Sequence, residues 1–256
     1  MAKVRVLVLR APGTNCDDET VFAFQQVGAE VSSVHVNRLI CREERLADYR
    51  IMVIPGGFTY GDDIAAGKVL ANELRLKLGE EILRFIEEGG LILGICNGFQ
   101  VLVKAGFLPD PTKGSALSVT LTNNDSGKFE CRWIHLEANR NSPCVFTQGV
   151  DRMYLPVAHG EGKLVALPGL LAEVSIALRY IDEDGNNRAC YPHNPNGSVN
   201  NIAGICDDSG RIFGLMPHPE RHLRGTQHPQ WTRLGLKKYG DGFQVFRNAV
   251  KWARSL

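Results

Sequence analysis

The sequence predicts an α/β domain: an open, mostly parallel sheet flanked by helices, with additional short strands in the second half. Over the first hundred residues, short β-branched apolar runs alternate with longer helical patterns, as in βαβ units around a parallel sheet. Beyond about residue 115 the apolar runs become shorter and are separated by turn residues. With 44% hydrophobic and 22% charged residues, the composition suits a packed core, and we expect residues 1–256 to form a single domain.

The first half of the chain supplies the parallel strands and their helices. Strands are expected at residues 4–9, 31–36, 50–54 and 91–95. Between the first two, a helix begins at the acidic residues 17–19, which suit a helix N-terminus, and ends at Gly28. A longer helix shows one apolar stripe over residues 74–86, and Gly89 ends it.

The second half of the chain predicts further strands and a closing helix. The strands are expected at residues 117–122, 129–136, 153–158, 175–181, 202–206 and 211–215. Asp184-Gly185 and Asn196-Gly197 have the composition of hairpin turns. Apolar residues at helical spacing from Phe243 to Val250 predict a final amphipathic helix.

Residues 223–241 form the least regular stretch of the chain. Proline and polar residues interrupt the regular spacing of apolar residues that a helix or strand would show. The stretch also contains four basic residues, namely Arg224, Arg233, Lys237 and Lys238. Two interpretations remain open for this segment, a solvated surface loop or a docking surface for a partner.

Charge and cysteine usage exclude several classes of protein. Twenty-nine basic and 28 acidic residues leave a net charge of +1, too balanced for broad phosphate neutralisation, so no nucleic-acid partner is expected. No apolar run approaches the roughly 20 residues that span a bilayer, and no leader precedes the first strand, so we expect a cytoplasmic protein without membrane contact. Seven cysteines without a CxxC pair indicate free thiols.

Gly94-Ile95-Cys96-Asn97-Gly98 is the most informative stretch of the sequence. It lies between an apolar strand and a helical pattern, where small flanking residues permit a tight turn that projects one side chain. The N-terminus of the following helix favours a thiolate, so Cys96 is a candidate nucleophile. The alternative is that Cys96 is a small buried core residue.

His218 and Glu220 can supply the base and its orienting group. They follow the strand at residues 211–215, so they are expected at the sheet edge where Cys96 also lies. In an extended segment, residues i and i+2 point to the same side, which allows Glu220 to hold the imidazole of His218.

Backbone N–H groups at the ends of two strands can form an oxyanion hole. The turn Pro55-Gly56-Gly57 can bring the Gly57 N–H to the site, and the Asn97 N–H is the second candidate donor. A plain tight turn is the alternative. Neither Gly61-Asp62-Asp63 nor the lone Cys190-x-x-His193 offers enough convergent ligands, so no metal is expected.

Together these residues resemble the class I (triad) glutamine amidotransferases, whose fold is flavodoxin-like. The resemblance spans almost the whole chain and is closest to the branch that serves phosphoribosylformylglycinamidine synthase in purine biosynthesis. It is carried by residues 11–17 (APGTNCD), 55–63 (PGGFTYGDD), 94–100 (GICNGFQ), 156–162 (PVAHGEG), 194–198 (NPNGS) and 214–221 (GLMPHPER).

The resemblance implies a catalytic triad of Cys96, His218 and Glu220. Cys96 attacks the side-chain amide of glutamine, His218 protonates the leaving ammonia, and water hydrolyses the γ-glutamyl thioester to glutamate. The resemblance also places substrate-binding residues at Gln100, His159, Gly160 and Glu161.

The resemblance further implies a partner that uses ATP. Ammonia would pass to a synthetase subunit that converts formylglycinamide ribonucleotide to formylglycinamidine ribonucleotide, and a small subunit that bridges the two is a further expectation. The sequence has no phosphate-cradling P-loop, so no cofactor is expected on this chain, and ATP and magnesium are expected on the synthetase.

Two other functions remain open at this point. One is an elbow-cysteine hydrolase of the same fold, either a γ-glutamyl hydrolase or a protease-like enzyme, because one architecture hosts several activities. The other is a regulatory binding subunit without catalysis.

Overall fold

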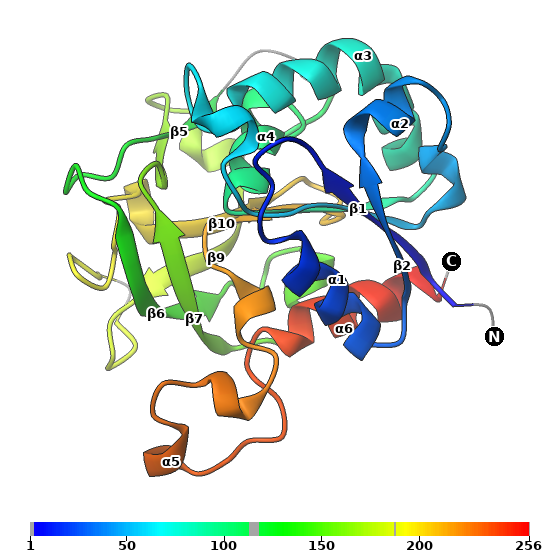
Figure 1. Cartoon of the computed structure of the whole chain (residues 1–256). Coiled ribbons are helices and arrows are strands. Elements are labelled where there is room, and N and C mark those ends of the chain that lie inside the picture. Colours follow the sequence, from blue (N-terminus) through cyan, green and yellow to red (C-terminus); the bar gives the residue numbers. More distant parts are fainter. Residues whose placement is uncertain (1–2, 113–117, 187, 256) are drawn as a thin grey trace.

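The computed structural model describes residues 3–112, 118–186 and 188–255 (Figure 1). Its main sheet has nine strands in the order β2-β1-β3-β4-β11-β10-β9-β6-β7. These strands are β1 (Arg5–Arg10), β2 (Glu30–His35), β3 (Ile51–Ile54), β4 (Leu91–Ile95), β6 (Glu130–Ala138), β7 (Arg152–His159), β9 (Ser175–Ile181), β10 (Ile202–Cys206) and β11 (Ile212–Leu215).

The half of the sheet from β2 to β11 is parallel and forms the centre of the core. Every residue of β3, β4 and β11 is buried, which explains why these strands are continuous apolar runs rather than alternating ones. β4 lies between β3 and β11, and Ile95 pairs with Leu215, so β4 and β11 end side by side.

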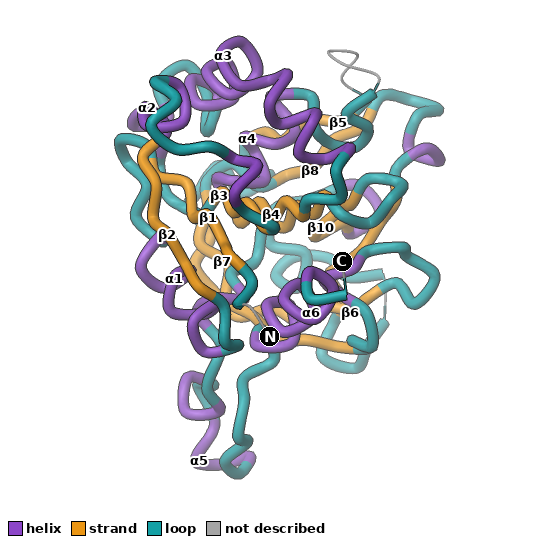
Figure 2. The backbone as a smooth tube through the Cα atoms, turned by 90° about the vertical axis from the view of Figure 1, so that its right-hand side faces the viewer, coloured by secondary structure: helices purple, strands orange, loops and turns teal. Residues whose placement is uncertain are grey.

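Helices cover both faces of this parallel half (Figures 1 and 2). On one face lie α2 (Val36–Ile40), α3 (Lys68–Glu87) and α4 (Asn97–Ala105), and on the other lie α1 (Asp17–Gln26) and α6 (Phe243–Ala253). The ring of Phe24 meets that of Phe246 edge to face, with centroids 5.1 Å apart, which joins α1 to α6.

The other half of the sheet is antiparallel and curves back toward the parallel half. β10, β9, β6 and β7 pair antiparallel, and a separate pair is formed by β5 (Val119–Thr122) and β8 (Lys163–Ala166). β7 is the far edge strand, yet the N–H of His218 donates to the carbonyl of Pro156 in β7, at 2.9 Å. β7 therefore lies against the residues that follow β11.

The structure confirms the predicted fold class and most of the predicted strands. The bounds of β4, β9 and β10 are those expected from the sequence. Val36 was expected to end a strand, but it begins α2, where the imidazole of His35 caps the N–H of Asn37. Residue 117, expected in a strand, lies outside the described residues. Strand β8 was not predicted, because four residues are too few to show an alternating hydrophobic pattern.

The two predicted hairpin turns are wrong. Gly185 and Gly197 both lie in the long connection between β9 and β10, and neither joins paired strands directly. Gly185 lies in a turn in which its N–H donates to the carbonyl of Asp182. Gly197 lies in a loop in which its N–H donates to the side-chain oxygen of Asn194. Asp-Gly and Asn-Gly supply positive φ wherever a turn needs it, so the dipeptide alone does not specify a hairpin.

Residues 224–239 project from the body as a loop with a closed neck (Figures 1 and 2). At the neck, the N–H of Gly240 donates to the carbonyl of Leu223 at 2.8 Å, and the N–H of Gly242 to that of His222 at 3.0 Å. The loop contains the short helix α5 (Trp231–Leu234). Across the part of the chain that the structure describes, no helix combines the length and apolarity required to span a membrane.

Candidate active site

Cys96 occupies a strained turn between β4 and α4. Its φ of 51° and ψ of −105° fall outside the regions that non-glycine residues ordinarily adopt, at a cost of about 1–3 kcal/mol. Its N–H donates to the carbonyl of Leu215 at 2.8 Å, which ties the turn to the end of β11.

The flanking glycines make this turn possible. A Cβ on Gly98 would lie 1.8 Å from the carbonyl oxygen of Ile54, and one on Gly94 would lie 2.6 Å from Cδ1 of Leu102. Helix α4 therefore packs directly on β3 and β4, with the Cys96 side chain at its N-terminus. The structure therefore confirms the predicted tight turn between β4 and α4, with Cys96 at its apex.

His218 and Glu220 form a buried pair directly after β11. Nδ1 of His218 lies 2.5 Å from Oε1 of Glu220, and each residue is only 1% exposed. Burial by itself lowers the pKa of His218, but the charges of Glu220 and of the Cys96 side chain outweigh it, so the pKa lies well above 6.5. Nε2 of His218 has no hydrogen-bond partner among the described residues, which leaves this nitrogen free for a proton transfer.

Gly56 is the point at which these side chains meet. A Cβ at this position would lie 2.9 Å from Cε1 of His218 and 3.5 Å from Cβ of Cys96. The imidazole and the thiol therefore pack around the same glycine, one from β11 and the other from β4. The predicted proximity of Cys96, His218 and Glu220 is confirmed.

Gly57 and Asn97 lie beside the thiol, as predicted. Gly57 has a φ of 150° and lines the same cavity as Cys96, and a Cβ on it would lie 2.8 Å from the N of Asn15. Within the described residues, neither the Gly57 N–H nor the Asn97 N–H donates to another group. Two unused donors next to a nucleophile are the requirement for an oxyanion hole.

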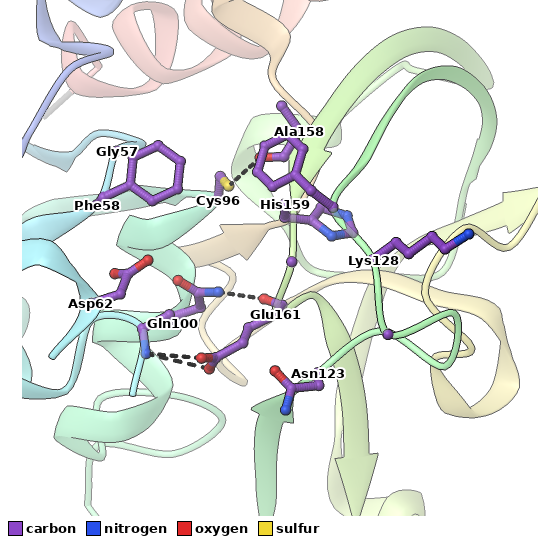
Figure 3. A pocket seen from close by; sticks show the side chains of 14 residues that line it. Gly57, Phe58, Asp62, Cys96, Gln100, Asn123, Lys128, Ala158, His159 and Glu161 are labelled. Carbon is purple, nitrogen blue, oxygen red and sulfur yellow. Dashed lines mark hydrogen bonds between the residues drawn. The ribbon is translucent and has the colours of Figure 1, made fainter. Parts of the chain in front are cut away.

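A cavity of about 400 Å³ opens on Cys96 (Figure 3). Its walls come from the turn after β3, from α4 and from the segment that follows β7; the residues predicted to bind substrate all line it, namely Gln100, His159, Gly160 and Glu161. The thiol of Cys96 points to the carbonyl of Ala158 at 3.6 Å. The volume suits a small-molecule ligand.

Comparison with known proteins agrees with this geometry. Residues 3–253 match the family model described as CobB/CobQ-like glutamine amidotransferase domain. The chain belongs to this family. It is 59% identical over 256 residues to the phosphoribosylformylglycinamidine synthase subunit PurQ of Dehalococcoides mccartyi, with 100% of each chain covered. The corresponding subunit of Pyrococcus furiosus is 38% identical over 257 residues, again with 100% of each chain covered.

A solved structure extends the comparison to the whole fold. The amidotransferase domain superposes on a chain from the structure of PurLQS from Thermotoga maritima with a TM-score of 0.76 and 34% identity, covering 98% of this chain and 99% of that chain. The fold of this chain is therefore shared with that amidotransferase chain.

Gln100 and Glu161 join the two walls of the amidotransferase site. The side-chain amide of Gln100 donates to the backbone carbonyl of Glu161 (Figure 3). The side-chain oxygen of Gln100 accepts from Nδ2 of Asn97 at 3.0 Å. The carboxylate of Glu161 accepts from the N–H of Ala66 at 3.3 Å. Both residues therefore support the cavity wall, and Glu161 does so through its backbone as well as its side chain.

Lys104 was not predicted from the sequence. It lies on α4 with 8% of its side chain exposed, where Nζ donates to the carbonyl of Ala66 at 2.6 Å and pairs with Glu161 at 3.3 Å. Burial lowers the pKa of Lys104, and the charge of Glu161 opposes this. A lysine at a helix C-terminus is an ordinary surface pattern, so no local signal distinguishes this buried cation.

Asp62 was considered for a metal site and lies instead on the cavity wall. Its carboxylate accepts from Nδ2 of Asn97 at 3.2 Å and faces the cavity beside Gln100 (Figure 3). Burial raises the pKa of Asp62, and the charge of Glu161 adds to this rise.

His159 is buried beside the cavity in a neutral form. Its Nδ1 lies 3.1 Å from Oδ1 of Asn124, whereas Nε2 is unpartnered within the described chain. Burial, reinforced by the charge of His218, lowers the pKa of His159 to about 4. His159 therefore carries no charge at neutral pH.

Two aromatic rings from opposite walls stand at the cavity. Phe58 and Phe129 stack with centroids 6.4 Å apart and an interplanar angle of 30°. Both remain about half exposed, at 45% and 53%. Neither was predicted, because the pairing depends on how the turn after β3 meets the loop before β6.

Proposed function

We propose that this chain is the glutaminase subunit of a phosphoribosylformylglycinamidine synthase. The observation that carries this function is the meeting of the strained Cys96, which lines a small-molecule cavity, with the buried His218–Glu220 pair. The names of the relatives from Dehalococcoides mccartyi and Pyrococcus furiosus support the assignment to purine biosynthesis.

The first half of the reaction forms a thioester. The sulfur of Cys96 attacks the side-chain amide carbon of glutamine, and the carbonyl electron pair moves onto its oxygen, which accepts from the N–H groups of Gly57 and Asn97. Nε2 of His218 then gives its proton to the amide nitrogen, and the carbon–nitrogen bond breaks to release ammonia.

The second half of the reaction hydrolyses the thioester. Nε2 of His218, now neutral, takes a proton from water as the water oxygen attacks the thioester carbon. The carbon–sulfur bond breaks, glutamate leaves, and the sulfur of Cys96 is restored. Glu220 remains ionised and holds the imidazole through Nδ1.

Asp62 is suited to hold the ammonium group of the substrate. Its carboxylate is on the cavity wall beside Gln100. An ammonium placed there would gain a charge-assisted hydrogen bond and would offset the effect of the nearby Glu161 charge. The side-chain amide of the same glutamine would then extend toward Cys96.

The released ammonia would be used by a synthetase subunit that binds ATP and magnesium. The structure of PurLQS from Thermotoga maritima supports such an assembly. We propose that a further small subunit bridges this chain and the synthetase. We place the complex in the cytoplasm, which agrees with seven free cysteines.

Residues 224–239 are the docking segment for that synthetase. This loop exposes four large apolar side chains among basic ones: Trp231 at 39%, Leu234 and Leu236 at 64% each, and Tyr239 at 43%. Such apolar anchors with a positively charged rim suit an acidic protein surface with an apolar centre.

Covalent labelling tests the glutaminase assignment. The full chain is incubated with diazo-oxo-norleucine, alone and with the synthetase, and then analysed by intact mass and peptide mapping. A single adduct on Cys96 that excess glutamine prevents is the expected result. No adduct in the assembled complex would contradict the proposed function and favour a regulatory subunit, and protection by a γ-glutamyl peptide but not by glutamine would favour a hydrolase.

Excision of the loop tests the docking segment. Because Leu223 and Gly240 are already hydrogen-bonded, residues 224–239 can be replaced by a short glycine linker that leaves the neck intact. Affinity for the synthetase, measured by calorimetry, is expected to fall by about 100-fold or more, while labelling of Cys96 persists. Unchanged affinity would show that the loop is only a surface feature.

A further inference from the structure

The side chain of Asn97 joins the two segments that carry the proposed oxyanion donors. One segment is the turn after β3, which contains Gly57, and the other is the start of α4, which contains Asn97 itself. In the part of the chain that the structure describes, the hydrogen bonds between residues 55–62 and residues 96–100 all end on the Asn97 amide. This amide is therefore the hydrogen-bonded link between the two segments beyond the ends of β3 and β4.

Thr59 supplies two of the four hydrogen bonds of the Asn97 amide. Its hydroxyl donates to Oδ1 of Asn97 at 2.7 Å, and its N–H donates to the same oxygen at 3.3 Å. Nδ2 of Asn97 donates to the side-chain oxygen of Gln100 at 3.0 Å and to the carboxylate of Asp62 at 3.2 Å. Because only the amide oxygen can accept from the N–H of Thr59, these partners fix which way the amide faces.

The contact between Thr59 and Asn97 is buried. Each of the two residues is only 1% exposed, so water does not compete for its hydrogen bonds. With both lone pairs of Oδ1 and both hydrogens of Nδ2 in use, the amide has a single satisfied orientation. The contact therefore holds the backbones of the two segments in one relative position.

We propose that Thr59 is a positioning residue for the oxyanion hole and acts through the side chain of Asn97. This inference rests on the proposed function, in which the N–H groups of Gly57 and Asn97 hold the oxyanion. Such donors must lie about 2.7–3.1 Å from the oxygen of the tetrahedral intermediate, so a shift of one segment against the other weakens a hydrogen bond to it. Gly57 lies two residues before Thr59, so the contact links the two donors over a short path.

The contact should affect the rate more than the binding of glutamine. The oxyanion exists only in the intermediate and in the transition states next to it, so its donors do not hold the bound substrate. Thr59→Val keeps the shape of the side chain without the hydroxyl. We expect kcat for glutamine hydrolysis in the complex with the synthetase to fall about tenfold, with KM within about twofold of the wild type.

Conservative and matched variants control this measurement. Thr59→Ser retains the hydroxyl and should keep kcat within about twofold of the wild type. Asn97→Ala keeps the backbone donor but removes the whole contact, and should lower kcat about 100-fold. Thr147→Val removes another buried threonine hydroxyl, which lies in the turn Val145–Thr147 and donates to the carbonyl of Cys144 at 3.4 Å, and should leave kcat unchanged.

Inhibition by glutamate γ-semialdehyde distinguishes positioning from a loss of folded enzyme. On the proposed function, this aldehyde adds to the sulfur of Cys96 as a thiohemiacetal, whose oxygen occupies the oxyanion hole. The inhibition constant should therefore rise about tenfold in Thr59→Val, in step with the fall in kcat/KM. A variant that only left part of the enzyme unfolded would lower kcat and leave the inhibition constant unchanged.

The outcomes distinguish the inference from the function on which it rests. A wild-type kcat in Thr59→Val, or a lower kcat with an unchanged inhibition constant, would overturn the positioning role while leaving the glutaminase assignment intact. Absence of glutamine hydrolysis in the wild-type complex would instead reject the proposed function, and the inference with it.

Discussion

The two halves of the main sheet contribute different parts of the site. On the proposed function, the parallel half supplies the reacting groups, each from the carboxyl end of a strand: Gly57 after β3, Cys96 after β4 and His218 after β11. The antiparallel half supplies the wall that faces them, through Ala158 and the residues that follow it. The proposed function thus assigns the chemistry to buried strands, and substrate recognition to a curved edge that can vary without disturbing them.

The difference between the halves is also electrostatic. In the parallel half, the pKa of His218 is raised because the charges of Glu220 and Cys96 outweigh burial. In the antiparallel half, the pKa of His159 is lowered to about 4, because burial, reinforced by the charge of His218, outweighs the opposing charge of Glu130. Two buried histidines of one cavity therefore differ in charge at neutral pH, which suits one for proton transfer and the other for packing.

Loss of the nucleophile should have the largest effect. Cys96→Ala is expected to lower glutamine-dependent synthesis by about 10⁴-fold or more, because no thioester can form. Synthesis from added ammonia should be retained, since only the source of ammonia is lost. Both rates are measured in the complex with the synthetase, with Cys131→Ala in the antiparallel half as the control thiol. Loss of both rates in a folded complex would contradict the division of labour between the subunits.

Substitution of the base, His218, should lower activity more than substitution of its orienting group, Glu220. His218→Ala removes the proton carrier and should approach the loss seen for Cys96→Ala, whereas Glu220→Gln keeps a hydrogen-bonding group at Nδ1 and should cost about 10²- to 10⁴-fold in kcat. Steady-state glutaminase rates of the two variants in the complex provide the measurement. An effect of Glu220→Gln as large as that of His218→Ala would show that orientation is as important as proton transfer.

The wall between the two halves should affect binding more than chemistry. Lys104→Met leaves the Glu161 carboxylate without its cation and loosens the contact with Gln100. We expect the KM for glutamine to rise about tenfold with little change in kcat, which corresponds to about 1.4 kcal/mol of binding. Lys77→Met is the matched control, because its pair with Glu73 is half exposed and should contribute under about 0.5 kcal/mol. A change confined to kcat would refute the positioning role.

His159 should have the smallest effect on the reaction, because its expected contribution is to stability at low pH. Its pKa is about 4 in the folded chain and 6.5 when exposed, so between these values the unfolded state binds more protons. The free energy of unfolding therefore falls as the pH drops from 6.5 toward 4, by about 3 kcal/mol from this group. His159→Gln should remove that part of the slope in urea denaturation. An unchanged slope would show that His159 titrates normally.

Much of the parallel half could be predicted because its determinants are local. Buried central strands must be continuous apolar runs, and the turn at Cys96 requires glycine at positions 94 and 98, so both features can be recognised in a short window of sequence. The positions of His218 and Glu220 follow from the same logic, since the residues after neighbouring parallel strands meet at one edge. Their catalytic roles remain predictions for the variants above to test.

The cavity wall was decided only by the tertiary structure. An ion pair joins the buried Lys104 to the partly buried Glu161, 57 residues apart, and its formation depends on the antiparallel strands curving until β7 meets the end of β11. The sequence around Lys104 and around Glu161 does not distinguish either residue from an exposed lysine or glutamate. Sequence periodicity reports which side of its own element a residue occupies, whereas burial, pairing and pKa depend on which other element packs there, and only the folded chain determines that.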